Sequence, residues 1–238
     1  MPPWNFEATR ALVSALHSEA QADRVWSALQ SIYKRQHIAA YHFHEYKRLL
    51  KERLDPQLEV KRPLELILSP EDDEGQSIHT IQLHVLAHVI ACMQSLHALG
   101  DTLAYAIALS LGIDCGPKPL PESKITVGSV LARIEQEPRW SQLHGALREL
   151  QANADFELLT AVVNHSKHRS IIVADFHFDA TGTAPSIYQF RLPTFTFKGK
   201  SHESRDVETF LEPLYAWLSP QIVACGNALN ASLLAGRA

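Results

Sequence analysis

The longest apolar stretch in the chain, residues 81–111, restricts the possible fold more than any other feature of the sequence. Apolar residues such as Leu86, Val89 and Met93 recur there at positions that cover most of the circumference of an α-helix. Side chains that are costly in hydrocarbon interrupt the stretch, which argues against a membrane span; they are His84, His88, Gln94, His97 and Asp101. We therefore predict a central, buried helix of roughly 30 residues.

Most of the remaining chain shows the 3.6-residue period of amphipathic helices. We predict helices over about residues 6–35, with a break near Ala20 left open, and over about 38–54, 127–134, 140–150, 155–169 and 205–234. Asp55-Pro56 is expected to end the second helix. Residues 55–76, which are rich in proline and acidic residues, are expected to form a solvated, mobile loop. The sequence thus predicts a mainly α fold, a helical bundle.

A period of two residues replaces the helical period between about residues 171 and 199. The alternating apolar positions are Phe176, Phe178, Tyr188, Phe190, Leu192, Phe195 and Phe197. We predict a small antiparallel β-hairpin or three-stranded insertion there, before the C-terminal helix. We expect its aromatic rings to pack the sheet onto the bundle and not to stack on bases. The whole chain, residues 1–238, is expected to form a single helical domain with this insertion.

Charge and cysteine content narrow the classes of function. The chain of 238 residues has a net charge of −4, so it has no overall cationic field for a nucleic acid, and any such contact must be local. Its three cysteines are widely spaced and form no C-x-x-C pair, which favours reduced thiols over a disulfide framework or a zinc site. The N-terminus lacks the pattern of a secretory signal. We expect a cytoplasmic protein with no membrane association.

The segment Asn164-His165-Ser166-Lys167-His168-Arg169 is the most distinctive part of the sequence chemically. On a helix, Asn164, Lys167 and His168 fall on one polar strip. An imidazole exchanges protons near neutral pH, and lysine and arginine offer positive charge to a phosphate, so the segment suits phosphodiester chemistry or anion binding. A simpler interpretation is that Asn164 and His168 satisfy backbone groups at a helix end, with Lys167 and Arg169 in water near the negative end of the helix dipole.

This segment, extended by Val163, resembles part of the HEPN superfamily of small helical-bundle proteins from prokaryotic defence and toxin systems. The resemblance includes Gln94-Ser95-Leu96-His97-Ala98-Leu99-Gly100-Asp101-Thr102-Leu103-Ala104 in the apolar stretch and covers about residues 78–170. In the family's ribonucleases, a helix carries arginine, usually a polar residue, three variable residues and histidine, and the pair assembles at a dimer interface. Matched onto this chain, Asn164 takes the polar place and His168 the histidine place, whereas Val163 stands in the place of the arginine.

The missing arginine changes what the resemblance implies. Valine carries no charge and donates no hydrogen bond, and Lys167 would replace a guanidinium only in part because an ammonium lacks its bidentate geometry. The resemblance therefore implies a HEPN-like binding or regulatory module, a homodimer that binds RNA or a nucleotide without the family's ribonuclease activity. The candidate site residues are His168, Asn164 and Lys167, with His165, Arg169 and Asp101 as further ligand-binding candidates.

Two alternatives remain open at this point. The first is a metal-independent RNA endonuclease that uses His168 as its general acid and base, with Asn164 and Lys167 positioning the phosphate. The second is an interaction protein without a ligand site, in which the segment only terminates a helix.

Two histidine-containing pairs on the apolar helix suggest other chemistry. His84 and His88 have the i, i+4 spacing of metal ligands, but the sequence fixes no third ligand, so we favour histidines bonded to neighbouring helices. His97 and Asp101 share this spacing, and Asp101 would hold the tautomer of His168 if the two residues faced each other. The chain has no P-loop, dinucleotide-binding or nucleophile-elbow motif. We predict no cofactor and no metal.

Overall fold

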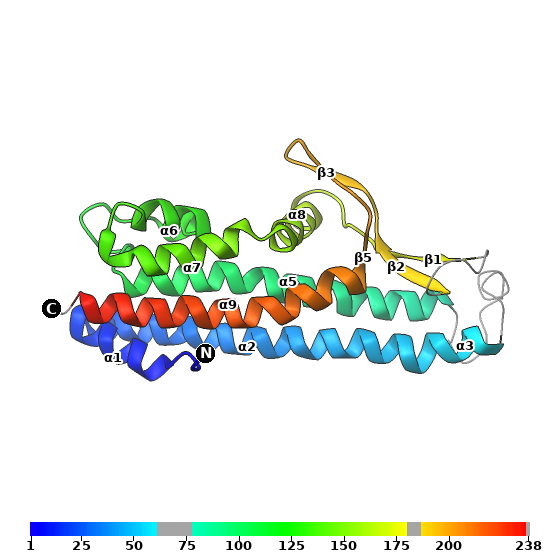
Figure 1. Ribbon diagram of the computed structural model, residues 1–238, viewed down its shortest axis with the longest axis horizontal. Coiled ribbons are helices and arrows are strands. Elements are labelled where there is room, and N and C mark those ends of the chain that lie inside the picture. Colours follow the sequence, from blue (N-terminus) through cyan, green and yellow to red (C-terminus); the bar gives the residue numbers. More distant parts are fainter. Residues whose placement is uncertain (61–77, 180–186, 237–238) are drawn as a thin grey trace. The chain divides into compact units, whose positions relative to one another are not determined.

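Helices make up most of the computed structural model, which describes residues 1–60, 78–179 and 187–236 (Figure 1). In chain order, the helices before the strands are α1 (Phe6–Leu16), α2 (Glu19–Leu49), the π-helical turn η1 (Leu50–Leu54), α3 (Asp55–Val60), α5 (Ile78–Ser110), the 3₁₀ turn η2 (Glu122–Lys124), α6 (Val127–Ile134), the 3₁₀ turn η3 (Pro138–Trp140), α7 (Ser141–Ala152) and α8 (Ala154–His168). The strands β1 (Asp175–Phe178), β2 (Tyr188–Leu192), β3 (Phe195–Phe197), β4 (Lys200–His202) and β5 (Arg205–Asp206) precede the last helix, α9 (Val207–Ala235). The prediction of a mainly α bundle with a small antiparallel insertion before the C-terminal helix is confirmed.

The first two predicted helices are divided differently in the structure. The break comes at His17, whose backbone leaves the helical region (φ −126°, ψ −83°), and α2 then continues through the boundary that we expected near residue 36. The expected end at Asp55-Pro56 is also wrong, because α3 begins at Asp55. Proline fits in the first turn of a helix, where its missing N–H group has no intrahelical partner to lose. Most of the predicted loop over residues 55–76 lies outside the described residues.

Helix α5 confirms the prediction of a long apolar helix. Within the described ranges, it is the one helix whose length and apolarity would allow it to cross a membrane, and half of its most apolar window is buried by other parts of the protein. Its fully buried residues include Val85, Val89, Leu103 and Ile107. A core helix has the same composition, so apolarity alone does not indicate a membrane span here.

The chain divides into two compact units, and the limits between them fall inside α2, α5, α8 and α9. Unit 1 comprises residues 1–37, 96–157 and 214–238. Gln21 of α2 donates from its side chain to the carbonyl of Leu109 in α5 (2.9 Å), and Gln221 of α9 donates to that of Ala146 in α7 (2.8 Å). Both glutamines are buried, so their amides satisfy backbone carbonyls that would otherwise lose hydrogen bonds to water.

A close contact joins the N-terminal segment of unit 1 to α9. A Cβ added to Gly226 would lie 1.8 Å from Cδ2 of Trp4, so the indole ring occupies the space that any other side chain would need. The indole N–H of Trp4 donates to the hydroxyl of Thr9 (2.9 Å), which donates in turn to Oδ1 of Asn230 (2.6 Å). Glycine at position 226 therefore suits this packing, because only a residue without a Cβ lets the indole ring lie against the helix backbone.

Unit 2 comprises residues 38–95 and 158–213 and contains every strand among the described residues. Strands β1, β2 and β5 form one antiparallel sheet with β2 in the centre, and β3 and β4 form a separate hairpin. Strand β4 lies just beyond the predicted insertion, and β5 occupies the first two residues of the final helix that we had expected from about residue 205. Phe190 and Leu192 of β2 are buried, as predicted for sheet residues that pack on a bundle, whereas Phe176 and Phe178 of β1 are half-buried.

Candidate functional site

Helix α8 carries most of the candidate residues, and its own sequence explains where it begins and which face it buries. The side chain of Asn153 caps its start by accepting from the N–H of Phe156 (2.9 Å). Leu159, Val162 and Val163 are buried, so one face of α8 belongs to the core. The basic residues of its last turn lie near the negative end of the helix dipole, where positive charge is favourable.

The side chains of His165 and Ser166 hold the end of α8. Nδ1 of His165 lies 2.9 Å from the carbonyl oxygen of Ser170, so that nitrogen carries the hydrogen and donates. The hydroxyl of Ser166 accepts from the N–H of Ile172 (3.0 Å). The simpler interpretation of the segment had named Asn164 and His168 for this role, whereas these two contacts are made by His165 and Ser166.

The other residues of the segment differ in their access to solvent. Lys167, His168 and Arg169 are exposed, and Asn164 is half-buried. Val163, in the place of the family's arginine, is only 2% exposed. A charged residue at that buried position would need a partner inside the core, so valine there serves packing and offers nothing to a ligand.

The β3–β4 hairpin contributes cations that sequence reasoning missed. Lys198 and Gly199 connect the two strands with positive φ angles (50° and 80°), as a two-residue hairpin turn requires. The ammonium of Lys198 lies 5.4 Å from the centre of the Phe197 ring, within the range of a cation–π contact. The Lys-Gly pair between residues of alternating polarity was the sequence signal that could have revealed this turn.

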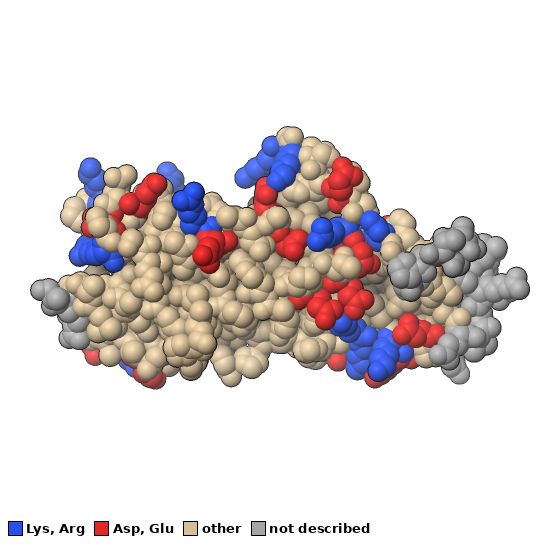
Figure 2. Space-filling view, viewed as in Figure 1, with Lys and Arg blue, Asp and Glu red and all other residues tan. Residues whose placement is uncertain are grey.

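His165 joins the end of α8 to this hairpin. Its imidazole packs edge-on against Phe195 and Phe197 of β3, with ring centroids 5.8 and 6.3 Å apart. We call the resulting set of side chains the cationic aromatic surface; it comprises His165, Lys167, His168, Arg169, Phe197, Lys198 and Lys200. Lysine or arginine side chains lie over the hairpin at the top of Figure 2, with acidic side chains beside them. The surface combines positive charge with aromatic rings, and its residues all belong to unit 2.

Asp101 belongs to unit 1 and lies close to His97, one turn earlier on the same helix. Its carboxylate lies 3.6 Å from Nδ1 of His97, which is too long for a hydrogen bond but close enough for an ion pair if the imidazole is protonated. His97 is 7% exposed, whereas the Asp101 side chain is 58% exposed. We had considered two partners for Asp101, namely His97 and His168. The structure places its carboxylate near His97.

The side chains of His84 and His88 lie in different surroundings. His84 is exposed, whereas Nδ1 of His88 lies 2.9 Å from Nδ1 of His42 on α2. This contact is the bond between neighbouring helices that we favoured over a metal site. Across the residues that the structure describes, no three histidine, cysteine or acidic side chains are grouped as metal ligands.

Comparisons with protein-family models, with curated proteins and with solved structures found no match to this chain. Fold and site therefore define a class only: a mainly α protein with a small antiparallel insertion and a cationic aromatic surface. The resemblance to HEPN proteins stays a prediction based on the residues quoted above.

Proposed function

We propose that this chain is a HEPN-like binding module that holds single-stranded RNA on the cationic aromatic surface and does not cleave it. The observation that carries the proposal is the packing of His165 between the end of α8 and the β3–β4 hairpin. Through this contact, the helix end that carries Lys167 and Arg169 adjoins the hairpin that carries Lys198 and Lys200. Cations attract the phosphates of a single strand, and unstacked bases stack on aromatic rings.

The local nature of the surface agrees with the overall charge. A protein with a net charge of −4 binds a polyanion only where cations are concentrated. Lys167, Arg169 and Lys198 are exposed, so their charges are available to phosphates. The half-buried ring of Phe197 lies beside Lys198 and offers an edge or face to a base.

The absence of cleavage follows from Val163 and from the roles of the neighbouring residues. A phosphodiester transition state needs fixed positive charge beside the reacting phosphate, and the buried valine supplies none. Incubation of an end-labelled single-stranded RNA with the protein in EDTA is expected to leave the RNA intact. Cleavage that disappears in His168→Ala would refute this part of the proposal and favour the metal-independent endonuclease.

Binding is best tested by fluorescence anisotropy with a labelled RNA of roughly 12 nucleotides. We expect about 10-fold or greater loss of affinity when Lys167, Arg169, Lys198 and Lys200 are all replaced by glutamine. A control variant with the same change in net charge replaces four exposed cations elsewhere: Lys34, Lys51, Lys124 and Arg148. Equal losses in the two variants, or no binding by the parent protein, would contradict the proposal and leave an interaction protein.

A homodimer and a cytoplasmic location belong to the same proposal. From Pro213 to Gly236 the chain contains no charged residue, and most of the surface over this part of α9 in Figure 2 lacks lysine, arginine, aspartate and glutamate. Depletion of charge is typical of the centre of a protein interface, so we infer that this face of α9 pairs with a second copy. Light scattering at several protein concentrations tests this. The three cysteines are unpaired, as in a reducing compartment.

A further inference from the structure

A second candidate site lies in unit 1. It shares no residue with the cationic aromatic surface, which belongs to unit 2. It is a pocket of about 620 Å³ beside the turn that follows α5. Its walls come from residues 111–113 and 115–117, from the end of α6 and from η3, and His17 also lines it. Pockets that hold small organic molecules have volumes of about 300–1,000 Å³, so this one is large enough for such a ligand.

The charged side chains that line the pocket are mostly cationic. Arg133 and Arg139 contribute two guanidinium groups, against the single carboxylate of Glu137. Glu137 lies 3.5 Å from Nε of Arg139, which leaves the terminal nitrogens of that guanidinium available. Arg133 donates to the carbonyl of Lys118 (3.3 Å) and is exposed. Two guanidinium groups beside one cavity favour a phosphate or carboxylate.

The same part of the pocket offers a flat apolar platform. The guanidinium of Arg139 lies over the indole of Trp140, 4.7 Å from the ring centre. Trp140 is half-buried, so part of its ring remains open to the pocket that it lines. A planar ligand gains stacking energy on the part of the indole that the guanidinium leaves uncovered.

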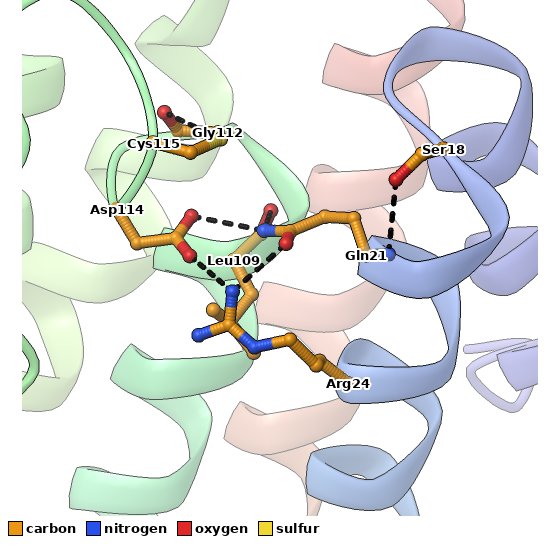
Figure 3. A network of polar contacts seen from close by, with 7 residues as sticks. All are labelled: Ser18, Gln21, Arg24, Leu109, Gly112, Asp114 and Cys115. Carbon is orange, nitrogen blue, oxygen red and sulfur yellow. Dashed lines mark hydrogen bonds and ion pairs between the residues drawn. The ribbon is translucent and has the colours of Figure 1, made fainter.

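The turn after α5, which lines the pocket, is held by a network of polar contacts, which Figure 3 shows. The carboxylate of Asp114 accepts from Arg24 (2.6 Å) through one oxygen and from the amide of Gln21 (2.9 Å) through the other. Gly112 has a positive φ of 66°, and a Cβ there would lie 2.7 Å from the imidazole of His17. The turn is therefore held in one conformation before any ligand arrives, which lowers the entropy cost of binding.

From these features we propose that the pocket of unit 1 binds a small anion that carries a flat ring, of the nucleoside monophosphate kind. Arg133 and Arg139 bind the phosphate, and the ring stacks on Trp140. The proposal is independent of RNA binding, because the two sites share no residue.

The first test measures the binding of AMP to the full chain by equilibrium dialysis. AMP is expected to bind with a dissociation constant below about 1 mM, and adenosine and inorganic phosphate are each expected to bind at least about 10-fold more weakly. The double variant Arg133→Gln/Arg139→Gln should weaken AMP binding by about 10-fold or more, and so should the single variant Trp140→Leu. Arg148→Gln on α7 removes an exposed arginine outside the pocket and should leave binding unchanged.

A second measurement needs no variant. Cys115 lines the pocket and is exposed, whereas Cys92 and Cys225 are buried. In the native protein, iodoacetamide should therefore alkylate Cys115 first. Burial, with a smaller effect of Asp114, raises the pKa of the Cys115 thiol, so the reaction is run at alkaline pH. Bound AMP should slow this alkylation, as mass spectrometry of the peptide would show.

Several outcomes would overturn the proposal. AMP that neither binds below about 1 mM nor slows the alkylation of Cys115 refutes the pocket as a site for this ligand class. If inorganic phosphate binds as tightly as AMP, the proposed role of the ring is refuted. If Arg148→Gln loses as much AMP affinity as the double variant, the proposed role of Arg133 and Arg139 is refuted. Lys198→Gln should keep full affinity for AMP while it weakens RNA binding. Failure of one proposal therefore leaves the other testable.

Discussion

The imidazole of His165 packs edge-on against the ring of Phe195, at a centroid distance of 5.8 Å and an interplanar angle of 70°. The same imidazole donates to the carbonyl of Ser170 just beyond α8. One side chain thus terminates a helix and supports a hairpin that lies about 30 residues further along the chain. The cationic aromatic surface depends on this double role, because His165 contacts both Phe195 and Phe197 of the hairpin.

Replacement of His165 by alanine should therefore impair stability and RNA binding together. The loss of one hydrogen bond and of aromatic packing is expected to lower the free energy of unfolding by about 1–2 kcal/mol. His168→Ala is the matched comparison, because His168 is exposed at the end of the same helix and its loss should leave stability nearly unchanged. Urea denaturation measures both variants. Equal stability of the two proteins would contradict the role of His165.

The salt dependence of RNA affinity offers a finer test of the surface. For a single strand, the logarithm of the binding constant falls with the logarithm of salt concentration by about 0.7 for each phosphate that a cation neutralises. Lys198→Gln should reduce this slope by about 0.7, whereas Lys34→Gln should not change it. Anisotropy titrations at several potassium chloride concentrations give the slopes. An unchanged slope in Lys198→Gln would exclude a phosphate contact at the hairpin turn.

The residues that the sequence placed correctly are those whose structure depends on local periodicity. Helix α5 is recognisable because its apolar residues repeat over many turns, and α8 because of its apolar stripe and the polar residues around it. Lys167, His168 and Arg169 are exposed at the end of α8, as their composition indicates.

The features that the sequence did not reveal depend on contacts between distant segments. The role of His165 needs Phe195 and Phe197, and no periodicity links positions so far apart. The pocket of unit 1 likewise combines His17 with residues near 112 and 140, which only the folded chain brings together. Strand β4 is too short to give a clear alternating pattern. Tertiary packing decided each of these features.

Gly226 offers a test of the packing of Trp4 in unit 1. In Gly226→Ala the new methyl group would overlap the indole ring, so Trp4 would have to leave its place and its hydrogen bond to Thr9. We expect a loss of about 1–3 kcal/mol in the free energy of unfolding. Gly145→Ala on α7 is the control, because a Cβ there meets nothing within 4 Å and alanine favours a helix. A Gly226→Ala protein as stable as its parent would contradict the contact.

The Asp114 network predicts unequal effects for two ion pairs of unit 1. The Asp114 side chain is 9% exposed, and its hydrogen bond to Arg24 raises the pKa of that guanidinium. Asp114→Asn leaves one acceptor oxygen for two donors, Arg24 and the buried amide of Gln21, and should lower the free energy of unfolding by about 1–3 kcal/mol. Arg10→Gln removes the exposed pair with Asp23 and should cost less than about 0.5 kcal/mol. Chemical denaturation of both variants compares them, and the reverse order would contradict the network.

The contact between His42 and His88 in unit 2 should make stability depend on pH. Burial, followed by the nearby charge of His42, lowers the pKa of His88. The carboxylate of Glu45 opposes this shift, whereas His84 and Arg48 add to it. Between the lowered pKa and the ordinary histidine value of about 6.5, the unfolded chain binds more protons than the folded chain.

The free energy of unfolding should therefore decrease as the pH falls from about 7.5 to about 5.5, because acid favours the state that holds the extra proton. A second effect has the same sign: the 2.9 Å contact between the two Nδ1 atoms needs one nitrogen to donate and the other to accept, and protonation of the accepting ring removes the acceptor. His88→Asn, whose amide lies near the place of Nδ1, should flatten the pH dependence. His79→Asn changes an exposed histidine of the same helix and should keep it. Urea denaturation across this pH range distinguishes the two, and parallel curves for parent and His88→Asn would show that the histidine pair does not cause the dependence.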